Sequence, residues 1–136
     1  MLPFHLETVR LFLHVLAATI WVGGQLVLAA LVPALRSAGA DVPRAAARAF
    51  NRIAWPAFAV LVVTGMWNLA EIDVSNAPTS YQVTVFVKVA VAIIAGAAAA
   101  VHIAARSKLA LALGGAIGAL ASVAAVFLGV LLRTGS

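Results

Sequence analysis

Residues 11–35 read LFLHVLAATIWVGGQLVLAALVPAL, a run that contains no Asp, Glu, Lys or Arg. A helix needs roughly 20 apolar residues to cross the hydrocarbon core of a bilayer. The run also lacks the alternation of apolar and polar residues that a membrane barrel strand requires. It therefore predicts a membrane-spanning helix over residues 9–35 that ends near Pro33, since proline has no amide hydrogen to continue a helix.

Three further stretches have the same character, at residues 53–70, 81–105 and 109–132. The whole chain is 65% hydrophobic and 10% charged, with a mean hydropathy of +1.12. Soluble domains are closer to half apolar and a quarter charged. We therefore expect an all-α integral membrane protein, a single transmembrane domain over residues 1–136, folded as a four-helix up-down-up-down bundle.

The charges between these stretches predict the orientation of the chain. The first loop is basic, with four arginines against one acid: Arg36, Arg44, Arg48 and Arg52 against Asp41. The third loop is also basic, with Arg106 and Lys108. The second loop carries only the acids Glu71 and Asp73. Basic loops stay in the cytoplasm, so both termini are expected outside, with Arg10 and Arg133 as exceptions. Asp41 and Pro43 predict the start of a short amphipathic cytoplasmic helix over residues 43–51.

The net charge of +5 comes from basic residues that flank apolar spans. Membrane lipid headgroups are therefore the expected partner, and nucleic acid is not. The absence of cysteine excludes thiolate metal sites and iron–sulfur clusters. No H-E-x-x-H, G-x-S-x-G or P-loop motif is present, so no catalytic residue is assigned and a role other than an enzyme is favoured.

Small residues recur every four positions in the last stretch, at Gly114, Gly118 and Ser122. In lipid such a stripe lets two helix backbones approach closely. Packing within the bundle is the first interpretation of the stripe, and a homodimer interface is the second. The protein as a whole is expected to form a homodimer.

Polar side chains within the spans are the functional candidates, because they are costly in lipid. Five of them are expected at a similar depth in the outer half of the bundle: His14, Thr64, Met66, Asn68 and Lys88. His5 is expected just above them, and His102 near the cytoplasmic side. Helical spacing also puts His14, Trp21 and Gln25 on one face, with Gln25 on a path towards His102.

Each candidate has a structural alternative. His14 is either a ligand of copper or haem or a partner in a helix–helix hydrogen bond. Lys88 either extends to the interface or pairs with an anionic ligand group. Met66 is either a soft copper ligand or apolar filler, and Trp21 is expected to pack.

Three segments carry a family resemblance: LHVLAATIWVGGQL at residues 13–26, VTGMWNL at 63–69 and YQVTVFVKVAVAIIAGAAAAVHIAAR at 81–106. They resemble the copper-resistance D (CopD-like) membrane domain of the bacterial inner membrane. The resemblance implies that the chain binds or transports copper near its outer face. It implies His14 as the central ligand, with Met66, His5 and His102 as weaker candidates, and a periplasmic copper-binding protein as a partner.

A second resemblance involves His14, Trp21 and Lys88. They match the outline of the HemJ-type four-helix proteins of the haem pathway. This resemblance implies haem b, with His14 as axial ligand, Lys88 as the partner of a propionate, and Trp21 and Asn68 beside them. A structural accessory subunit remains the third alternative.

Overall fold

The computed structural model describes residues 3–135, and within that range the chain forms helices and no strands. The all-α prediction is confirmed. The elements in chain order are α1 (Leu6–Ala18), the π-helical turn η1 (Thr19–Gly23), α2 (Gly24–Ala38), α3 (Val42–Ala70), the 3-10 turn η2 (Val74–Asn76), α4 (Thr79–Ala104) and α5 (Lys108–Thr134).

Four helices in residues 3–135 are long and apolar enough to cross a membrane: Leu6–Ala38, Val42–Ala70, Thr79–Ala104 and Lys108–Thr134. The shortest has 26 residues, which at 1.5 Å per residue gives a length of about 39 Å. A typical hydrocarbon core is about 30 Å thick. Each helix is therefore long enough to extend beyond such a core.

The chain divides into two compact units, Met1–Ile72 and Asp73–Ser136. Unit 1 contains α1, η1, α2 and α3, and unit 2 contains η2, α4 and α5. The contacts of His14 with Thr64 and of Arg10 with Glu71 lie within unit 1, and that of His102 with Leu111 lies within unit 2.

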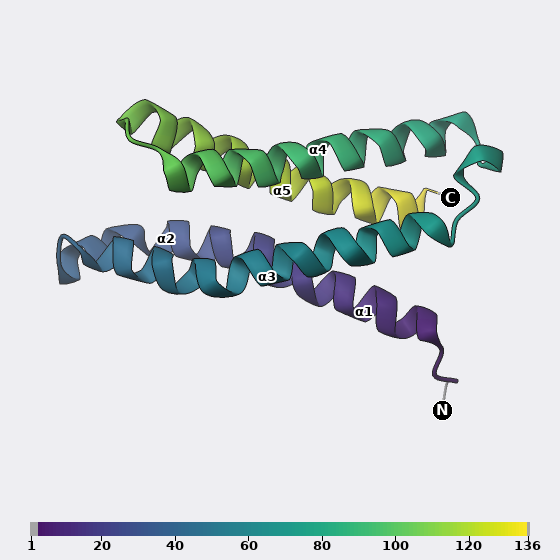
Figure 1. Ribbon diagram of the computed structural model, residues 1–136, viewed down its shortest axis with the longest axis horizontal. Coiled ribbons are helices and arrows are strands. Elements are labelled where there is room, and N and C mark those ends of the chain that lie inside the picture. Colours follow the sequence, from purple (N-terminus) through teal and green to yellow (C-terminus); the bar gives the residue numbers. More distant parts are fainter. Residues whose placement is uncertain (1–2, 136) are drawn as a thin grey trace. The chain divides into compact units, whose positions relative to one another are not determined.

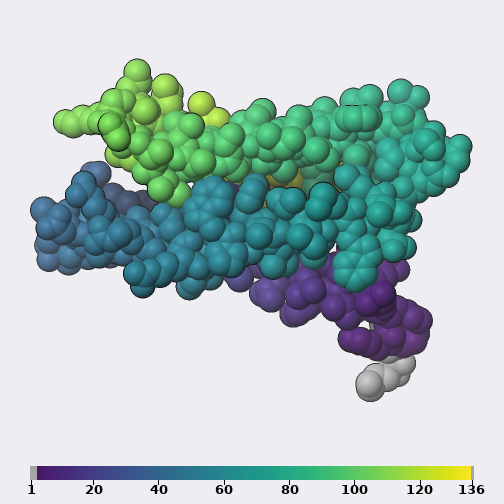
Figure 2. All heavy atoms as spheres, viewed as in Figure 1, coloured from purple at the N-terminus to yellow at the C-terminus, as the bar shows by residue number. Residues whose placement is uncertain are grey.

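Unit 1 is an antiparallel hairpin in which the first helix crosses α3 (Figure 1). The pairing is visible in its contacts: Arg10 lies near Glu71, His14 bonds to Thr64, and Trp21 stacks on Trp55. As the residue number increases along the first helix, the number of its partner on α3 decreases, so the two helices are antiparallel. The side chains of α3 form a continuous row on the face of unit 1 seen in the space-filling view (Figure 2).

The turn η1 interrupts the regular α-helix in the middle of the first span. Trp21 lies in this turn, is 4% exposed, and packs against Trp55 and Phe58 with ring centroids 5.4 and 4.5 Å away. The expectation that Trp21 packs is confirmed. Gln25 donates a 2.9 Å hydrogen bond from Nε2 to the Trp21 carbonyl. The even helical spacing used to align His14, Trp21 and Gln25 therefore does not hold through η1.

The expected short helix over residues 43–51 does not exist as a separate element. Those residues form the first turns of α3, which continues without a break to Ala70. The physical reason is that residues 43–53 contain four alanines and no glycine, so nothing ends the helix before the apolar span. Asp41 precedes α3 at the N-cap position, as expected, but its side chain makes no capping hydrogen bond.

Two prolines lie inside helices. Pro33 was expected to end the first span and instead lies inside α2, which continues to Ala38. Pro56 lies in the interior of α3. Each proline removes one backbone hydrogen bond, a loss that long apolar helices tolerate when the freed carbonyl finds another donor. The carbonyl freed by Pro33 is that of Ala29, and the 3.1 Å bond that the Ser37 hydroxyl donates goes to a different carbonyl, that of Pro33.

Unit 2 is an antiparallel hairpin of α4 and α5 that is closest at its turn. A Cβ at Gly114 would lie 2.9 Å from the backbone nitrogen of His102 and 3.0 Å from the carbonyl oxygen of Ala98. Gly114, the first residue of the stripe of small residues at 114, 118 and 122, therefore packs against α4 within the hairpin. This agrees with the interpretation of the stripe as packing within the bundle. Ser107 caps α5 by accepting a 3.1 Å hydrogen bond from the Ala110 amide.

The segment before α4 is held by a carboxylate. Asp73 accepts hydrogen bonds from the Ser75 hydroxyl at 2.6 Å and the Asn76 side-chain amide at 2.5 Å. These bonds, that of Ser75 first, hold the pKa of Asp73 below its ordinary value. The charged carboxylate thus helps to form η2, the turn that leads into α4.

Candidate functional site

A part-buried hydrogen bond joins α1 to α3 in unit 1. Nδ1 of His14, on α1, lies 2.7 Å from Oγ1 of Thr64, on α3. Thr64 is 3% exposed, so this contact belongs to the interior of the hairpin. The structure thus brings together two of the residues expected near the outer end of the bundle.

The protons of this pair can be assigned from its neighbours. The Thr64 hydroxyl also lies 2.6 Å from the Val60 carbonyl oxygen, and a carbonyl can only accept. Thr64 has one proton, and it goes to Val60. At the other contact Thr64 is then the acceptor, so Nδ1 of His14 carries the hydrogen and donates it. In the neutral ring the lone pair is therefore on Nε2, the nitrogen through which such a tautomer coordinates a metal or accepts a proton.

A glycine lies beside the imidazole. A Cβ at Gly65 would lie 3.6 Å from Cε1 of His14, an ordinary van der Waals distance. The ring therefore lies against the backbone of α3 on one side and bonds to Thr64 on the other. These contacts fix the orientation of His14.

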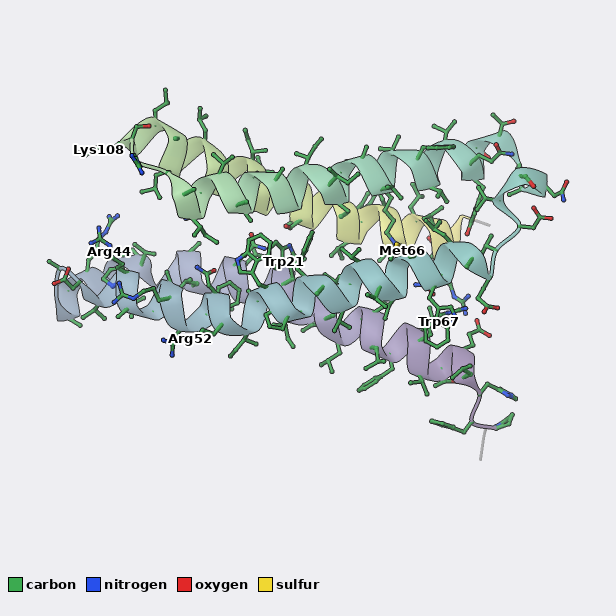
Figure 3. All side chains as sticks on the ribbon, viewed as in Figure 1. Trp21, Arg44, Arg52, Met66, Trp67 and Lys108 are labelled. Carbon is green, nitrogen blue, oxygen red and sulfur yellow. The ribbon has the colours of Figure 1, made fainter. Side chains whose placement is uncertain are left out.

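One helical turn from His14 lies a charged cluster that the sequence analysis did not assign. Arg10 is 8% exposed, and its Nη1 is 3.9 Å from Oε2 of Glu71. The guanidinium lies over the ring of Trp67, 5.9 Å from its centroid, and Trp67 donates a 3.2 Å hydrogen bond to Glu71. Trp67 points from α3 towards α1 (Figure 3). We call Arg10, Trp67 and Glu71 the Arg10 cluster.

The charge in this cluster is only partly compensated. Nε of Arg10 is buried without a hydrogen-bond partner, and so is Oδ1 of Asn68, the residue after Trp67. The carboxylate of Glu71 is 56% exposed, so its attraction for Arg10 is weakened by its surroundings. Buried polar groups are usually satisfied. This end of unit 1 therefore retains binding capacity for an anion or a polar group.

A shallow groove of about 320 Å³ runs beside the His14–Thr64 pair. Its lining is apolar and comes from both helices: Leu13 on α1, and Ala59, Val60, Val63, Thr64 and Trp67 on α3. Trp67 thus both lines the groove and supports the Arg10 guanidinium.

The other predicted copper ligands of unit 1 lie apart from His14. Met66 is 59% exposed and points to the side of α3 opposite Trp67 (Figure 3). His5 is the N-cap residue of α1 and is exposed, nine residues or about 13 Å along the helix from His14. Within residues 3–135 no group of three or more His, Asp or Glu side chains is arranged to hold a metal ion.

Two predicted site residues belong to unit 2. Lys88 is half-buried, and its Nζ would lie 3.2 Å from a Cβ at Gly129, so the absence of a side chain there makes room for the lysine. His102 donates from Nδ1 to the Leu111 carbonyl at 2.7 Å, because a carbonyl can only accept. His102 therefore joins α4 to the first turn of α5.

Sequence reasoning treated Arg10 only as an exception to the loop-charge rule. A signal for its role was nevertheless present. Arg10 precedes His14 by four residues, which places both side chains on the same face of a helix, and Glu71 ends the partner helix at the same level.

Comparisons of the chain with protein-family models, with curated proteins and with solved structures find no match. The resemblances to the CopD-like and HemJ-type families therefore stay predictions.

Proposed function

We propose that this chain is a CopD-like protein of the bacterial inner membrane that binds copper as a transported ion through Nε2 of His14. The single observation that carries the proposal is the hydrogen bond from His14 Nδ1 to Thr64. Because Thr64 gives its own proton to Val60, the tautomer leaves the lone pair on Nε2. An outer-sphere hydrogen bond of this kind fixes the ring of a coordinating histidine and raises its basicity.

In this proposal the four long helices cross the membrane up-down-up-down, with both termini outside. The arginines at the tip of unit 1 support this orientation, because all four are exposed: Arg36, Arg44, Arg48 and Arg52. Arg44 and Arg52 extend from the first turns of α3, and Lys108 lies at the turn between α4 and α5 (Figure 3). Basic groups at these two turns favour a cytoplasmic location.

A single imidazole suits an ion in transit better than a stored one. Copper in a closed site needs several ligands, and the described part of the chain has no group of three His, Asp or Glu that could provide them. An ion that must leave again benefits from weaker binding. Met66, His5 and His102 remain secondary ligands in the proposal, and Thr64 acts as the positioning residue for His14.

The test is copper binding by the purified protein in detergent. The protein would be titrated with Cu(I) in competition with a chromophoric chelator, and its copper content measured by elemental analysis. We expect His14→Ala to lose at least tenfold in affinity and His102→Ala to lose less, because His102 is a secondary ligand in the proposal and belongs to unit 2. Thr64→Val is expected to weaken binding and Thr64→Ser to preserve it. Equal affinity in wild type and His14→Ala would refute the copper proposal.

Haem b is the second candidate, and the Arg10 cluster is the observation that favours it. A haem needs an axial ligand and a cation for its propionates, and unit 1 provides His14 with Arg10 one turn away. Gly65 leaves a flat backbone surface against the imidazole. A bound haem would supply one-electron chemistry, while the residues of unit 1 would hold and orient it. A Soret band in the purified protein that disappears in His14→Ala would favour haem, and its absence with copper bound would exclude it.

A further inference from the structure

The positive charge of Arg10 is only partly compensated by its neighbours. Its side chain is 10% exposed, its Nε has no hydrogen-bond partner, and its nearest acid lies 3.9 Å away on an exposed residue, Glu71. A guanidinium has five donors in a planar fork that matches carboxylate and phosphate. A cation removed from water to this extent gains stability from an anion that approaches its outer edge.

The apolar groove reaches the same place. On α3 its lining extends from Ala59 to Trp67, about 12 Å along the helix axis. The ring of Trp67 lies at one end of the groove, and the Arg10 guanidinium lies over that ring. A cation is therefore positioned at the end of an apolar channel.

We propose that unit 1 binds one anionic phospholipid, with its phosphate paired with Arg10 and an acyl chain lying in the groove between Leu13 and Val63. A cation at the end of an apolar groove favours a ligand that has both an anionic group and an apolar chain. A free phosphate would satisfy Arg10 but leave the groove without a partner, and a neutral apolar molecule would fill the groove but leave Arg10 uncompensated. Lipids that carry net negative charge are favoured, because Glu71 is exposed and compensates the positive charge of Arg10 only in part, and because the positive choline group of a zwitterionic lipid would compete with Arg10 for the phosphate.

The proposal does not involve His14 and goes beyond the binding of copper or haem. It also gives Arg10 a role on the side of the membrane where the loop-charge rule does not expect a basic residue. Cationic side chains near the end of a membrane helix commonly reach the headgroup level. Here the guanidinium is held in one place by Trp67 and Glu71, so a specific complex is expected instead of a diffuse one.

Native mass spectrometry of the delipidated protein tests the proposal, with phosphatidylglycerol and phosphatidylcholine of matched chains as probes. We expect one phosphatidylglycerol to bind at least about tenfold more tightly than phosphatidylcholine, the scale of one charge-assisted hydrogen bond. Arg10→Gln should abolish this preference and Arg10→Lys should keep part of it. Arg133→Gln is the control of the same chemistry, because Arg133 is an exposed basic residue at the end of α5 that does not line the groove.

A second pair of variants tests the groove. Val63→Phe would fill it, whereas Val62→Phe adds the same bulk at an exposed neighbour outside the lining. We expect only Val63→Phe to reduce phosphatidylglycerol binding, with Cu(I) affinity at His14 unchanged. Three results would each overturn the proposal: equal binding of the two lipids, an unchanged preference in Arg10→Gln, or full competition by inorganic phosphate, which has no chain to place in the groove.

Discussion

Replacement of Gly114 by alanine is expected to separate α4 from α5. The added Cβ would lie 2.9 Å from the His102 nitrogen, 3.0 Å from the His102 Cα and 3.0 Å from the Ala98 carbonyl oxygen. An ordinary contact begins at 3.4 Å, so the shortfall is about 0.5 Å on the closest atom. All three atoms belong to the α4 backbone, which has no rotamer to change, so the helices themselves must shift.

The size of the effect follows from two opposing terms. Overpacking of a tight contact costs about 1–3 kcal/mol, and a Gly→Ala change inside a helix returns about 0.5–1 kcal/mol. The net expectation for Gly114→Ala is a loss of about 1–2 kcal/mol in the free energy of unfolding. Equilibrium unfolding in mixed micelles, with increasing denaturing detergent, measures it directly.

Two other glycines provide controls of the same chemistry. The nearest atom to a Cβ at Gly118 is 3.5 Å away, and a Cβ at Gly23 has no atom within 4 Å. Both Gly118→Ala and Gly23→Ala are expected to be neutral or slightly stabilising. The reasoning would be refuted if Gly114→Ala were as stable as wild type, or if all three variants lost stability equally.

Three further predictions concern other parts of the chain. Thr64→Val leaves the His14 Nδ1 hydrogen without its hydroxyl acceptor and should lower the free energy of unfolding by about 1–3 kcal/mol. Thr64→Ser should lower it by less than about 1 kcal/mol, because the hydroxyl acceptor remains. Equal losses of stability in the two variants would contradict the proton assignment. The hydrogen bonds of Ser75 and Asn76 lower the pKa of Asp73, so the charged carboxylate stabilises η2 at every pH above the ordinary pKa of 3.8, and this stabilisation is lost as the pH falls through the lowered pKa. Amide exchange at Asn76 and Ala77 should rise in that acidic range, and Asp73→Asn should remove the pH dependence. A reporter that is active only outside the cytoplasm should be active when fused to the C-terminus and silent when inserted at the turn of residues 39–41, and the reverse pattern would invert the proposed topology.

The number and type of the long helices followed from the sequence because lipid imposes a simple rule on length and polarity. The ends of the helices were predicted less accurately from the sequence. The second span was expected to begin at residue 53, but α3 begins at Val42, because an alanine-rich stretch of basic residues continues a helix that is already nucleated. Pro33 was expected to mark the end of the first span, although it lies inside α2.

The candidate site was predictable only in part. The pairing of His14 with Thr64 followed from matching depths on antiparallel helices, and the structure contains it. Depth alone does not specify the side of a helix, and so it could not separate Thr64 from Met66, which lies two residues later on another face of α3. The different roles of Gly114 and Gly118 depend on distances of tenths of an ångström, which no spacing rule contains.

The wide turn η1 has a consequence for how this chain can vary. A π-helical turn holds one residue more than an α-helical turn, so residues after it are set back by about 100° from the face that regular spacing predicts. Deletion of one residue from Thr19–Gly23 would therefore restore a regular helix without rotating the two halves of the first span relative to each other. The half that carries Arg10 and His14 and the half that follows Gly24 would keep the faces that they have, so the length of this span can vary by one residue without changing how its two halves pack.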